Sequence, residues 1–338
     1  MRPVTIAGAG LAGLALGCAL QRAGVSTTIH EAGTLPRHRV CGEFLCGRGA
    51  AALSALGLRD TLAGALEHRE VRWYLAAKPI LTSSLPAPAY GISRYLLDQR
   101  LANHYRESGG RLMERSRYTE SATEGFVGCS GREATKSDWI GLKLHCTDLR
   151  TEADLELHLG ENGYLGLSGV ESGRVNVCGL FKRRSNLTTR RENWLTEYLV
   201  ACGLPRIAER VQNGSIDPSS HAGVAGVQFA KPPARQPDRL RLGDAYSVIP
   251  PFTGNGMSVA LESAEVALPD LLAYAREQQP WQTTIDRIHR HCGQRFNNRL
   301  RAARRLHPWI SRPAGQHALG MLCRLHLLPF QFLYSRTH

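Results

Sequence analysis

The sequence contains no long hydrophobic run and no paired cysteine motif. No stretch of roughly 18 consecutive apolar residues occurs, so we expect no membrane-spanning helix. The nine cysteines form no Cys-x-x-Cys pair, and the histidines supply no matching His-x-x-x-His spacing. These absences exclude the common zinc motifs, and we expect no metal site. The cysteine pattern favours a cytoplasmic protein with reduced thiols, most of them buried.

Acidic residues are also few compared with basic ones. Asp and Glu together number 29, whereas Lys and Arg number 42, and the formal net charge is +13. Such a field attracts acidic partners, whether nucleotide phosphates, an acidic carrier protein, an anionic membrane surface or nucleic acid. The chain of 338 residues has 43% hydrophobic residues and no internal repeat, which suits one large or two modest folded domains.

The N-terminal segment predicts a β-α-β unit. Val4 to Ala7 is typical of a short buried strand, Leu11 to Ala23 of a helix and Val25 to His30 of a second strand. Arg2 and the apolar run behind it faintly resemble an export signal. The ordered glycines within that run favour a folded element instead, and we expect the protein to remain in the cytoplasm.

A Gly-x-Gly-x-x-Gly motif lies between the first predicted strand and helix. Gly8 permits a tight turn, Gly10 lets the backbone approach a pyrophosphate, and Gly13 lets the helix pack on the strand. The helix N-terminus at Leu11 offers N–H groups and partial positive charge to phosphates. Glu31 ends the second strand and can accept a hydrogen bond from a ribose hydroxyl. The alternative, a glycine-rich core helix, leaves Glu31 unexplained, so we predict dinucleotide binding.

Periodicity and turn residues predict the other elements. Helices are expected at Cys46 to Leu58, Tyr95 to Ser108, Leu187 to Cys202 and Gly256 to Tyr274, followed by a basic helical tail. Single strands are expected at Glu70 to Ala77, Ile80 to Ser84, Tyr90 to Ser93 and Arg239 to Leu242. Four short β-runs between residues 140 and 181, separated by Gly and Asn turns, predict an antiparallel sheet. Residues 231–237 form a proline-rich linker.

A second glycine-rich element follows the strand expected at residues 239–242. Gly243-Asp244 is followed by Pro250-Pro251 and by Gly254-Asn255-Gly256-Met257, which opens a helix. This arrangement resembles the FAD-dependent oxidoreductases that include geranylgeranyl reductases and para-hydroxybenzoate-hydroxylase-like flavin monooxygenases. The resemblance implies that Asp244 binds the ribityl chain of FAD and that the loop at Pro251 passes the isoalloxazine edge. A positive helix end facing the flavin would stabilise negative charge on its reduced form. The alternative is an ordinary Gly-Asp turn before a helix.

Three further segments are similar to the same superfamily. The segment from Arg39 to Glu43 resembles a Cys-Gly-Glu motif beside the flavin in geranylgeranyl reductases. The segment from Arg94 to Leu101 resembles an Arg-x-x-Leu-Asp-x-x-Leu helix near the cofactor, and Gly163-Tyr164 resembles the start of a substrate-sheet motif. The resemblance implies catalytic roles for Cys41, Pro251 and Tyr164. The motif and the resemblance together predict cofactor contacts from Gly8, Gly10, Leu11, Ala12, Gly13, Glu31, Ala32, Arg39, Cys41, Gly42, Arg94, Gly243, Asp244, Pro251, Gly254, Asn255, Gly256 and Met257.

The chain also departs from the superfamily pattern. Gly166 stands where the substrate-sheet motif has tryptophan, so we expect a wider or differently shaped pocket. Ser130-Gly131-Arg132 replaces the Asp-Gly motif of the monooxygenases and lacks its Asp. No Trp-x-Trp-x-Ile-Pro motif occurs, which argues against halogenation.

We therefore expect an α/β fold, α+β overall: a Rossmann-type FAD-binding domain, an antiparallel-sheet substrate domain and a helical C-terminal segment. The FAD-binding domain is expected to be discontinuous, at residues 1–66, 93–138 and 238–275. The substrate domain is expected at residues 67–92 and 139–237, and the basic helical segment at residues 276–338. Because the sequence has one dinucleotide motif, we expect the flavin to be reduced by transient NADH or NADPH, or by another electron donor.

Three functions fit this pattern. The first is reduction of a C=C bond in a hydrophobic or carrier-bound substrate by hydride from flavin N5, as in geranylgeranyl reductases. The second is a monooxygenase that hydroxylates or epoxidises its substrate through a flavin 4a-hydroperoxide. The third is a flavin-binding electron carrier without catalysis. Much of this chemistry belongs to the cofactor, so protein acids and bases need not be visible in the sequence.

Two residue patterns near these motifs have simpler interpretations. Cys41 and Cys46 form a redox dithiol under one hypothesis, and structural or flavin-lining thiols under the other. His289 and His291 fall on different sides of a helix, which argues against a metal site.

A run of arginines from Arg287 to Arg305 marks the basic helical tail. The simple interpretation is a solvated helix face. The functional alternative is docking of an acidic carrier protein or peripheral contact with an anionic membrane surface. The apolar segment from Ala318 to Tyr334 either caps the substrate cavity or touches lipid. No nucleic-acid-binding module accompanies the charge, so we expect no nucleic-acid partner.

Overall fold

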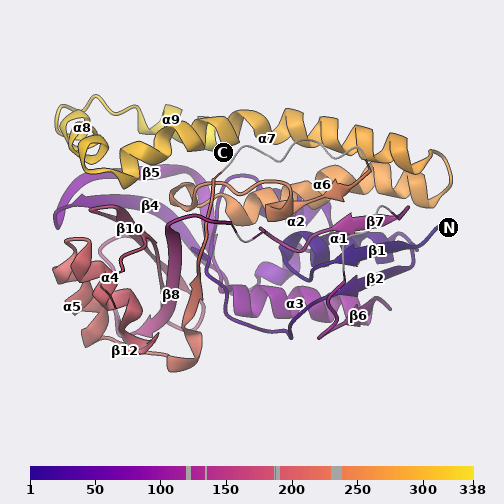
Figure 1. Cartoon of the computed structure of the whole chain (residues 1–338), viewed down its shortest axis with the longest axis horizontal. Coiled ribbons are helices and arrows are strands. Elements are labelled where there is room, and N and C mark those ends of the chain that lie inside the picture. The colour runs from indigo at the N-terminus through magenta and orange to yellow at the C-terminus, as the bar shows by residue number, and fades with distance from the viewer. Residues whose placement is uncertain (119–122, 134, 186, 188–190, 230–237) are drawn as a thin grey trace.

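The computed structural model describes residues 1–118, 123–133, 135–185, 187, 191–229 and 238–338. Two sheets with flanking helices organise these residues (Figure 1). The expected α/β architecture with a helical C-terminal segment is confirmed. The residue-level domain boundaries stay a prediction, and the expected linker at residues 231–237 lies outside the described residues.

The first sheet is parallel and contains the predicted β-α-β unit. Its strand order is β14-β7-β1-β2-β6. The strands are β1 (Val4–Ala7), β2 (Thr27–His30), β6 (Arg111–Met113), β7 (Phe126–Gly128) and β14 (Leu240–Arg241). Ile6 pairs with Ile29 on one side and Val127 on the other, and all three side chains are fully buried. Such apolar parallel strands require helices to cover the sheet.

Helix α1 (Leu11–Arg22) follows the first strand and is buried along most of its length. Its Ala, Gly and Leu residues let it pack against both α3 (Arg94–Glu107) and α6 (Gly256–Ala275). A Cβ at Gly17 would lie 2.9 Å from the Tyr105 ring, so only glycine allows α3 to approach this closely. The three helices and the parallel sheet share one continuous hydrophobic core.

Helix α2 (Gly49–Ala55) is shorter than the helix predicted from Cys46 to Leu58. Cys46 lies before the helix, where its thiol donates to the carbonyl oxygen of Gly254 at 3.2 Å. The helix ends before Gly57, which has a φ of +69°. Cys46 before α2 therefore makes a long-range hydrogen bond, and Gly57 after it forms a turn.

The second sheet has the strand order β12-β8-β11-β10-β9-β4-β5-β3, with β13 also paired to β8. The strands are β3 (Phe44–Leu45), β4 (Leu66–Leu75), β5 (Lys78–Gly91), β8 (Trp139–Thr147), β9 (Leu155–Gly160), β10 (Gly163–Val170), β11 (Arg174–Lys182), β12 (Ser215–Ile216) and β13 (Ala222–Val224). Every pair but one is antiparallel, as predicted. The exception is β4 with β9, which are parallel with Val71 opposite Leu155. The antiparallel expectation is corrected to a mixed sheet.

Strand β5 is one long strand instead of the two predicted strands. Its pairing with β4 is irregular between His68 and Glu70, where the partner changes from Ala89 to Ser84. Pro86 and Pro88 fall within the unpaired residues of β5. Proline is tolerated there because no ladder hydrogen bond needs its missing N–H. The prolines therefore mark a bulge and do not separate two strands.

Two helices pack on the second sheet beside β8. They are α4 (Trp194–Ala201) and α5 (Pro205–Asn213), and their apolar faces enter a core with β8, β10 and β11. Helix α5 was not predicted. The helix predicted from Leu187 begins at Trp194, after residues 188–190, which lie outside the described residues.

Three helices form the C-terminal segment: α7 (Trp281–Ser311), α8 (Pro313–Arg324) and α9 (Phe330–Thr337). Figure 1 shows α7 running along α6 towards the second sheet, where α8 and α9 turn back over β5. Among the described residues, no helix is both long enough and apolar enough to cross a membrane.

Candidate functional site

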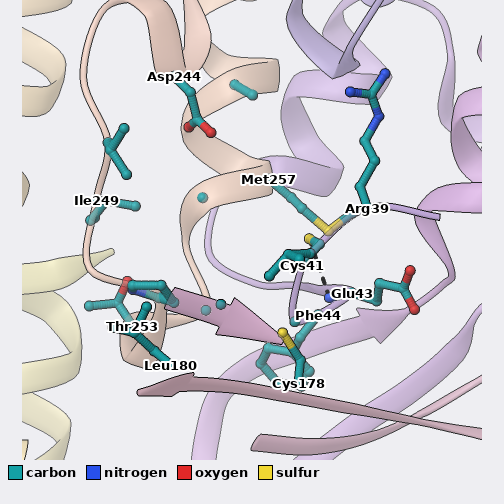
Figure 2. Close-up of a pocket in the computed structure, with 18 of the residues that line it drawn as sticks. Arg39, Cys41, Glu43, Phe44, Cys178, Leu180, Asp244, Ile249, Thr253 and Met257 are labelled. Carbon is teal, nitrogen blue, oxygen red and sulfur yellow. Dashed lines mark hydrogen bonds between the residues drawn. The ribbon is translucent and has the colours of Figure 1, made fainter. Parts of the chain in front are cut away.

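One cavity of about 1060 Å³ joins the parallel sheet to the second sheet. Its lining includes the β1–α1 turn, the segment from Arg37 to Phe44, the segment from Leu242 to Met257, strands of the second sheet, and helices α7 to α9. Both predicted glycine-rich elements therefore reach the same cavity. Figure 2 shows Asp244 and Met257 of the second element at its wall. A volume of this size accommodates a large organic ligand.

The three glycines of the β1–α1 turn have different surroundings. Gly8 has a φ of +109°, and a Cβ there would lie 2.2 Å from the carbonyl oxygen of Cys129. A Cβ at Gly13 would lie 2.0 Å from the carbonyl oxygen of Gly8, so Gly13 serves helix packing. Gly10 lines the cavity and has no protein atom within 4 Å of the position of its would-be Cβ. The backbone at Gly10 is therefore open to a ligand beside the N-terminus of α1.

Glu31 lies at the end of β2 and lines the cavity together with Ala32. Its carboxylate accepts hydrogen bonds from the N–H of Ala9 at 3.0 Å and of Gly33 at 2.9 Å, and from the Arg37 guanidinium at 2.8 Å. Burial would raise the pKa of Glu31, but these donors outweigh burial and lower it. Glu31 is thus an ionised acceptor at the position expected for ribose recognition.

The segment after β14 brings the second glycine-rich element against the first. A Cβ at Gly243, where φ is +61°, would lie 3.2 Å from Ala12 Cβ, so the two turns nearly touch. Asp244 follows and faces the cavity. Its carboxylate has no hydrogen-bond partner among the described residues, and burial raises its pKa although Arg94 and Arg132 oppose that rise. Asp244 is therefore an acceptor available to a ligand.

Helix α6 begins at this segment and points its N-terminus at the cavity. Gly254, with a φ of +69°, precedes it, and Gly254, Gly256 and Met257 line the cavity. Asn255 is fully buried behind the wall and donates from Nδ2 to the carbonyl oxygen of Thr337 at 2.5 Å. Asn255 and Gly13 are the two predicted cofactor residues that do not line the cavity. Their direct binding roles stay predictions.

Two arginines at the cavity share one buried carboxylate. Asp98 is fully buried and accepts from Arg39 Nε at 3.0 Å and from Arg94 Nε at 2.8 Å. Burial would lower the pKa of Arg94, but Asp98 outweighs this and raises it. Asp98 therefore holds both predicted arginines in place. It was not among the predicted cofactor contacts, because it acts on a cofactor only by positioning Arg39 and Arg94.

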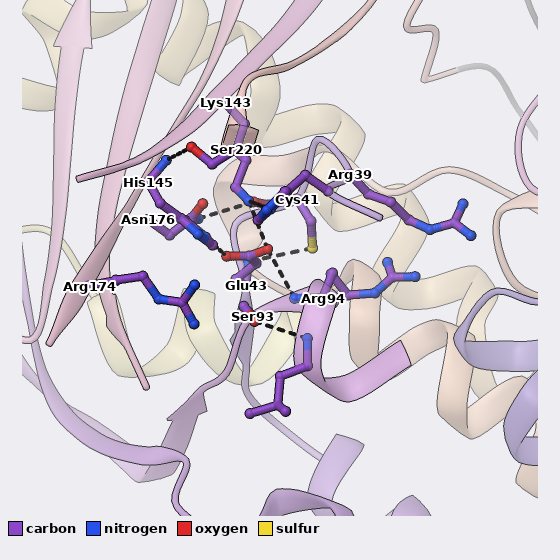
Figure 3. A network of polar contacts seen from close by, with 12 residues as sticks. Arg39, Cys41, Glu43, Ser93, Arg94, Lys143, His145, Arg174, Asn176 and Ser220 are labelled. Atoms are coloured by element: carbon purple, nitrogen blue, oxygen red, sulfur yellow. Dashed lines mark hydrogen bonds and ion pairs between the residues drawn. The ribbon is translucent and has the colours of Figure 1, made fainter. Parts of the chain in front are cut away.

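The segment from Cys41 to Glu43 is held by the second sheet (Figure 3). Asn176 Nδ2 donates to the carbonyl oxygen of Cys41 at 3.1 Å, and the Ser168 hydroxyl donates to that of Gly42 at 2.9 Å. The N–H of Glu43 donates to the Cys41 sulfur at 3.4 Å. The segment is thereby clamped in place at the cavity wall.

The Glu43 side chain forms a buried charge cluster. Its carboxylate accepts from Lys143 Nζ at 3.1 Å, contacts His145 Nε2 at 2.5 Å and accepts from the N–H of Arg94 at 2.9 Å. All three side chains of Glu43, Lys143 and His145 are buried. Burial would raise the pKa of Glu43, but His145 and Lys143 lower it. The cluster ties β8 to the N-terminus of α3, and sequence reasoning missed Lys143 and His145.

The predicted catalytic cysteine Cys41 lines the cavity, but it has no contact with Cys46. Burial raises the pKa of Cys41 and raises that of Cys46 to about 12, so both are neutral thiols at pH 7. Cys129 and Cys178 also line the cavity, and Figure 2 shows Cys178 of β11 on the same wall as Cys41. No spacing in the sequence could have indicated this pair.

The other two predicted catalytic residues meet at the far side of the cavity. The N–H of Phe252, next to Pro251, donates to the Tyr164 hydroxyl oxygen at 3.2 Å. Burial raises the pKa of Tyr164, so its hydroxyl stays protonated. Tyr164 and Pro251 both line the cavity. The catalytic roles of Cys41, Pro251 and Tyr164 stay predictions.

Arg132 lies in the Ser130-Gly131-Arg132 segment, which lacks the Asp of the Asp-Gly motif. It lines the cavity and donates to the carbonyl oxygens of Gly226 at 3.0 Å and Ala225 at 2.8 Å. Burial lowers the pKa of Arg132. This segment therefore adds a cation near Asp244.

Several arginines of the basic run pair with acidic residues of α6. Arg299 is bidentate with the buried Glu262 of α6, and Arg295 joins the same carboxylate at 3.3 Å. Arg287 pairs with Asp270 at 3.0 Å. The simple interpretation of a solvated helix face is corrected for Arg299 and Arg295, which are buried or partly buried, whereas Arg287 is half-exposed. Among the described residues, no group of three potential ligands could hold a metal ion.

The fold is that of FAD-dependent oxidoreductases. HpxO of Klebsiella pneumoniae, solved with FAD and uric acid, matches at a TM-score of 0.77 and 15% identity, over 99% of this chain and 96% of that one. PqsL of Pseudomonas aeruginosa, a probable FAD-dependent monooxygenase, matches at 0.74 and 15%, over 94% and 98%. A geranylgeranyl bacteriochlorophyll reductase-like protein of Thermoplasma acidophilum matches at 0.73 and 17%, over 96% and 91%.

Two curated proteins with similar sequences are both named menaquinone reductase. Menaquinone reductase of Mycolicibacterium smegmatis is 23% identical over 322 residues, which cover 78% of this chain and 75% of that protein. Menaquinone reductase of Mycobacterium tuberculosis (strain ATCC 25618 / H37Rv) is 31% identical over 114 residues, which cover 32% of this chain and only 28% of that protein. No protein-family profile matches the chain. The resemblance expected from the motifs, to geranylgeranyl reductases and flavin monooxygenases, is confirmed by the structural matches.

Proposed function

We propose that the chain is an FAD-dependent oxidoreductase that acts on a hydrophobic small molecule. The observation that carries this proposal is that both glycine-rich segments and apolar residues of the second sheet line the same cavity. The residues fit FAD, because Gly10 leaves the backbone open and Asp244 offers an unpaired carboxylate. FAD would supply the electron-transfer chemistry when bound.

Within this proposal each part of the cavity wall has one task. Gly10 and the N-terminus of α1 bind the pyrophosphate, and Glu31 accepts from the adenosine ribose. Asp244 accepts from the ribityl chain. The N-terminus of α6 places partial positive charge beside the flavin ring. Arg39 and Arg94, held by Asp98, keep further positive charge at the cofactor.

The substrate end of the cavity is apolar. Leucines of β9 and β11, Phe252, and leucines of α8 and α9 line it. Gly166 also lines the cavity and has no side chain to fill it, which supports the expected wide pocket. A hydrophobic substrate gains affinity there by burying its surface, without needing charged partners.

We propose C=C reduction as the reaction, with monooxygenation as the second candidate. The Cys41–Glu43 segment and the sequence likeness to proteins named menaquinone reductase support reduction. Structural likeness to HpxO and PqsL supports monooxygenation. A flavin-binding electron carrier is the third candidate. Each requires an external reductant, for which we propose transient NADH or NADPH.

Oxygen distinguishes these candidates. The FAD-loaded protein is reduced with NADPH or NADH under argon, given a polyunsaturated isoprenoid substrate, and then tested again in air with ¹⁸O₂. Product formed under argon supports the reductase and contradicts the monooxygenase. Product formed only in air, and carrying ¹⁸O, supports the monooxygenase. Flavin that cycles without any product leaves the electron carrier.

We also propose that the hydrophobic substrate is delivered by a negatively charged partner. The excess of positive charge suits either an acidic carrier protein or an anionic membrane surface. Arg287, Arg295 and Arg299 already pair with α6, so the contact would use basic residues beyond them.

A further inference from the structure

The last 38 residues carry positive charge without any acidic residue. Residues 301–338 include Arg301, Arg304, Arg305, Arg312, Arg324 and Arg336, and no Asp or Glu. This segment comprises the end of α7, then α8 and α9. A surface of one sign attracts a partner of the opposite sign.

The same segment exposes apolar side chains. Met321 is 62% exposed, Leu325 61%, Leu327 63% and Phe332 54%. They belong to the outer side of α8, the α8–α9 connection and the outer side of α9. Arg324 lies next to Leu325, and the Arg336 guanidinium stacks on the Phe332 ring at 4.9 Å. Exposed apolar groups and arginines are therefore neighbours in this segment.

The inner faces of these helices line the cavity. Leu319 and Leu322 of α8, and Phe330 and Leu333 of α9, contribute to its wall. In α9 the inner residues are spaced three and four apart, while Phe332 and Arg336 face outward. Two short helices thus separate the apolar end of the cavity from an apolar outer surface.

Polar contacts hold the two helices at their ends. Gln316 of α8 donates to the carbonyl oxygen of Gly160 at 2.8 Å. In α9, Gln331 donates to the carbonyl oxygen of Ser84 at 2.8 Å, and Thr337 accepts from Asn255. The exposed connection from Leu325 to Leu327 lies between these anchors. The α8–α9 pair therefore covers the cavity while leaving its apolar connection free to enter another medium.

We propose that the outer surface of α8 and α9 docks on an anionic lipid bilayer and that hydrophobic substrate enters the cavity from the bilayer beneath these helices. The entry of substrate rests on the proposed function, whereas docking does not. A bilayer is favoured over an acidic protein because the exposed leucines gain by insertion into the acyl boundary while the arginines contact anionic headgroups. An acidic carrier would use the charges and leave the leucines in water.

The test is flotation of the full-length, FAD-loaded chain with vesicles. Vesicles contain either phosphatidylcholine alone or an equimolar mixture with phosphatidylglycerol. We expect the chain to float with the anionic vesicles and only weakly with neutral ones. We expect the double variant Leu325→Ser/Leu327→Ser to lower partitioning about tenfold or more, because two inserted side chains lose their apolar surface.

Matched variants control for surface polarity and for net charge. Val200→Ser/Leu66→Ser changes two exposed apolar residues, 56% and 42% exposed, outside the C-terminal segment and should float like the unaltered chain. Arg324→Gln should weaken flotation with anionic vesicles, whereas Arg206→Gln on α5 should not. All these residues are exposed, so the variants keep the fold, and retained FAD absorbance verifies this for each.

The outcomes separate docking from the proposed function. Flotation that survives Leu325→Ser/Leu327→Ser unchanged contradicts the proposal, and so does a chain that stays in solution with every vesicle. The second result would leave an acidic carrier protein as the remaining partner. A chain that floats but takes up no FAD keeps the docking surface and loses the proposed function. A chain that binds FAD but does not float keeps the proposed function and loses the docking surface.

Discussion

At the residue scale, the cavity wall consists of groups whose hydrogen bonds are either complete or open. Glu31 accepts three hydrogen bonds from the protein, and Asp98 accepts from two arginines. Asp244 accepts none among the described residues, and Gly10 has open space at its would-be Cβ. Polar groups without a partner in the protein, next to groups whose hydrogen bonds are satisfied, mark where a bound ligand supplies the contacts.

Gly10 and Gly13 provide a matched pair of substitutions. Gly10→Ala places a methyl group in the ligand's space, so we expect FAD affinity to fall about tenfold or more with the thermal midpoint of the FAD-free chain unchanged. Gly13→Ala forces a contact with the Gly8 backbone, so we expect it to cost about 1–3 kcal/mol of unfolding free energy. FAD fluorescence titration and urea unfolding measure the two effects. Equal effects from both variants would contradict the assignment.

The buried Glu156 of β9 should make the stability of the fold depend on pH. Burial would raise its pKa, but hydrogen bonds from His158, Arg210 and the N–H of Glu152 lower it from 4.5 to about 2. A carboxyl with a lowered pKa stabilises the folded state above pH 4.5, and this contribution is lost as the pH falls towards 2. Urea unfolding from neutral to acidic pH should show this loss, and Glu156→Gln should reduce its slope. An unchanged slope in the variant would show that Glu156 does not contribute.

Sequence could predict residues whose role depends on local spacing. The glycines, Glu31 and Asp244 lie in motifs, and all but Gly13 line the cavity. Lys143, His145 and Cys178 reach the site through strand pairing of the second sheet, which no local pattern encodes. Asn255 lies in a motif, yet its amide binds the backbone of Thr337, 82 positions away.

At the element scale, α7 is fixed to α6 by a buried ion pair. Glu262 is fully buried and accepts two hydrogen bonds from Arg299. Arg299→Met leaves the Glu262 charge with only part of its compensation, so we expect a loss of about 3 kcal/mol in unfolding free energy. The exposed Arg301→Met should change stability little. In urea unfolding, Arg299→Met/Glu262→Gln should recover part of the loss. If it recovers none, the pair is not the cause.

Periodicity predicted elements better than it predicted their partners. The β-α-β unit and α6 lie where their patterns placed them. The parallel pairing of β4 with β9 joins strands about 80 residues apart and leaves no trace in alternation of side chains. The continuity of β5 was hidden by Pro86 and Pro88, because a bulge and a strand break have the same local composition.

At the scale of the whole molecule, the Glu43 cluster connects the second sheet to helix α3, which packs on α1. Lys143 and His145 come from β8, whereas Glu43 precedes β3 and contacts the N-terminus of α3. Lys143→Met leaves Glu43 short of a partner in a buried place, so we expect a loss of about 3–5 kcal/mol. Urea unfolding measures this loss, and Lys143→Met/Glu43→Gln should restore part of it. Full stability in Lys143→Met would contradict the connection.

The proposed function depends on one FAD lying across both glycine-rich segments. The most direct test is the visible spectrum of the purified chain, with the bound molecule identified by mass spectrometry after release. We predict flavin absorbance near one FAD per chain, either as purified or after incubation with FAD, and weakened in Asp244→Ala. A chain that stays colourless after incubation with FAD would contradict FAD binding and the function proposed from it.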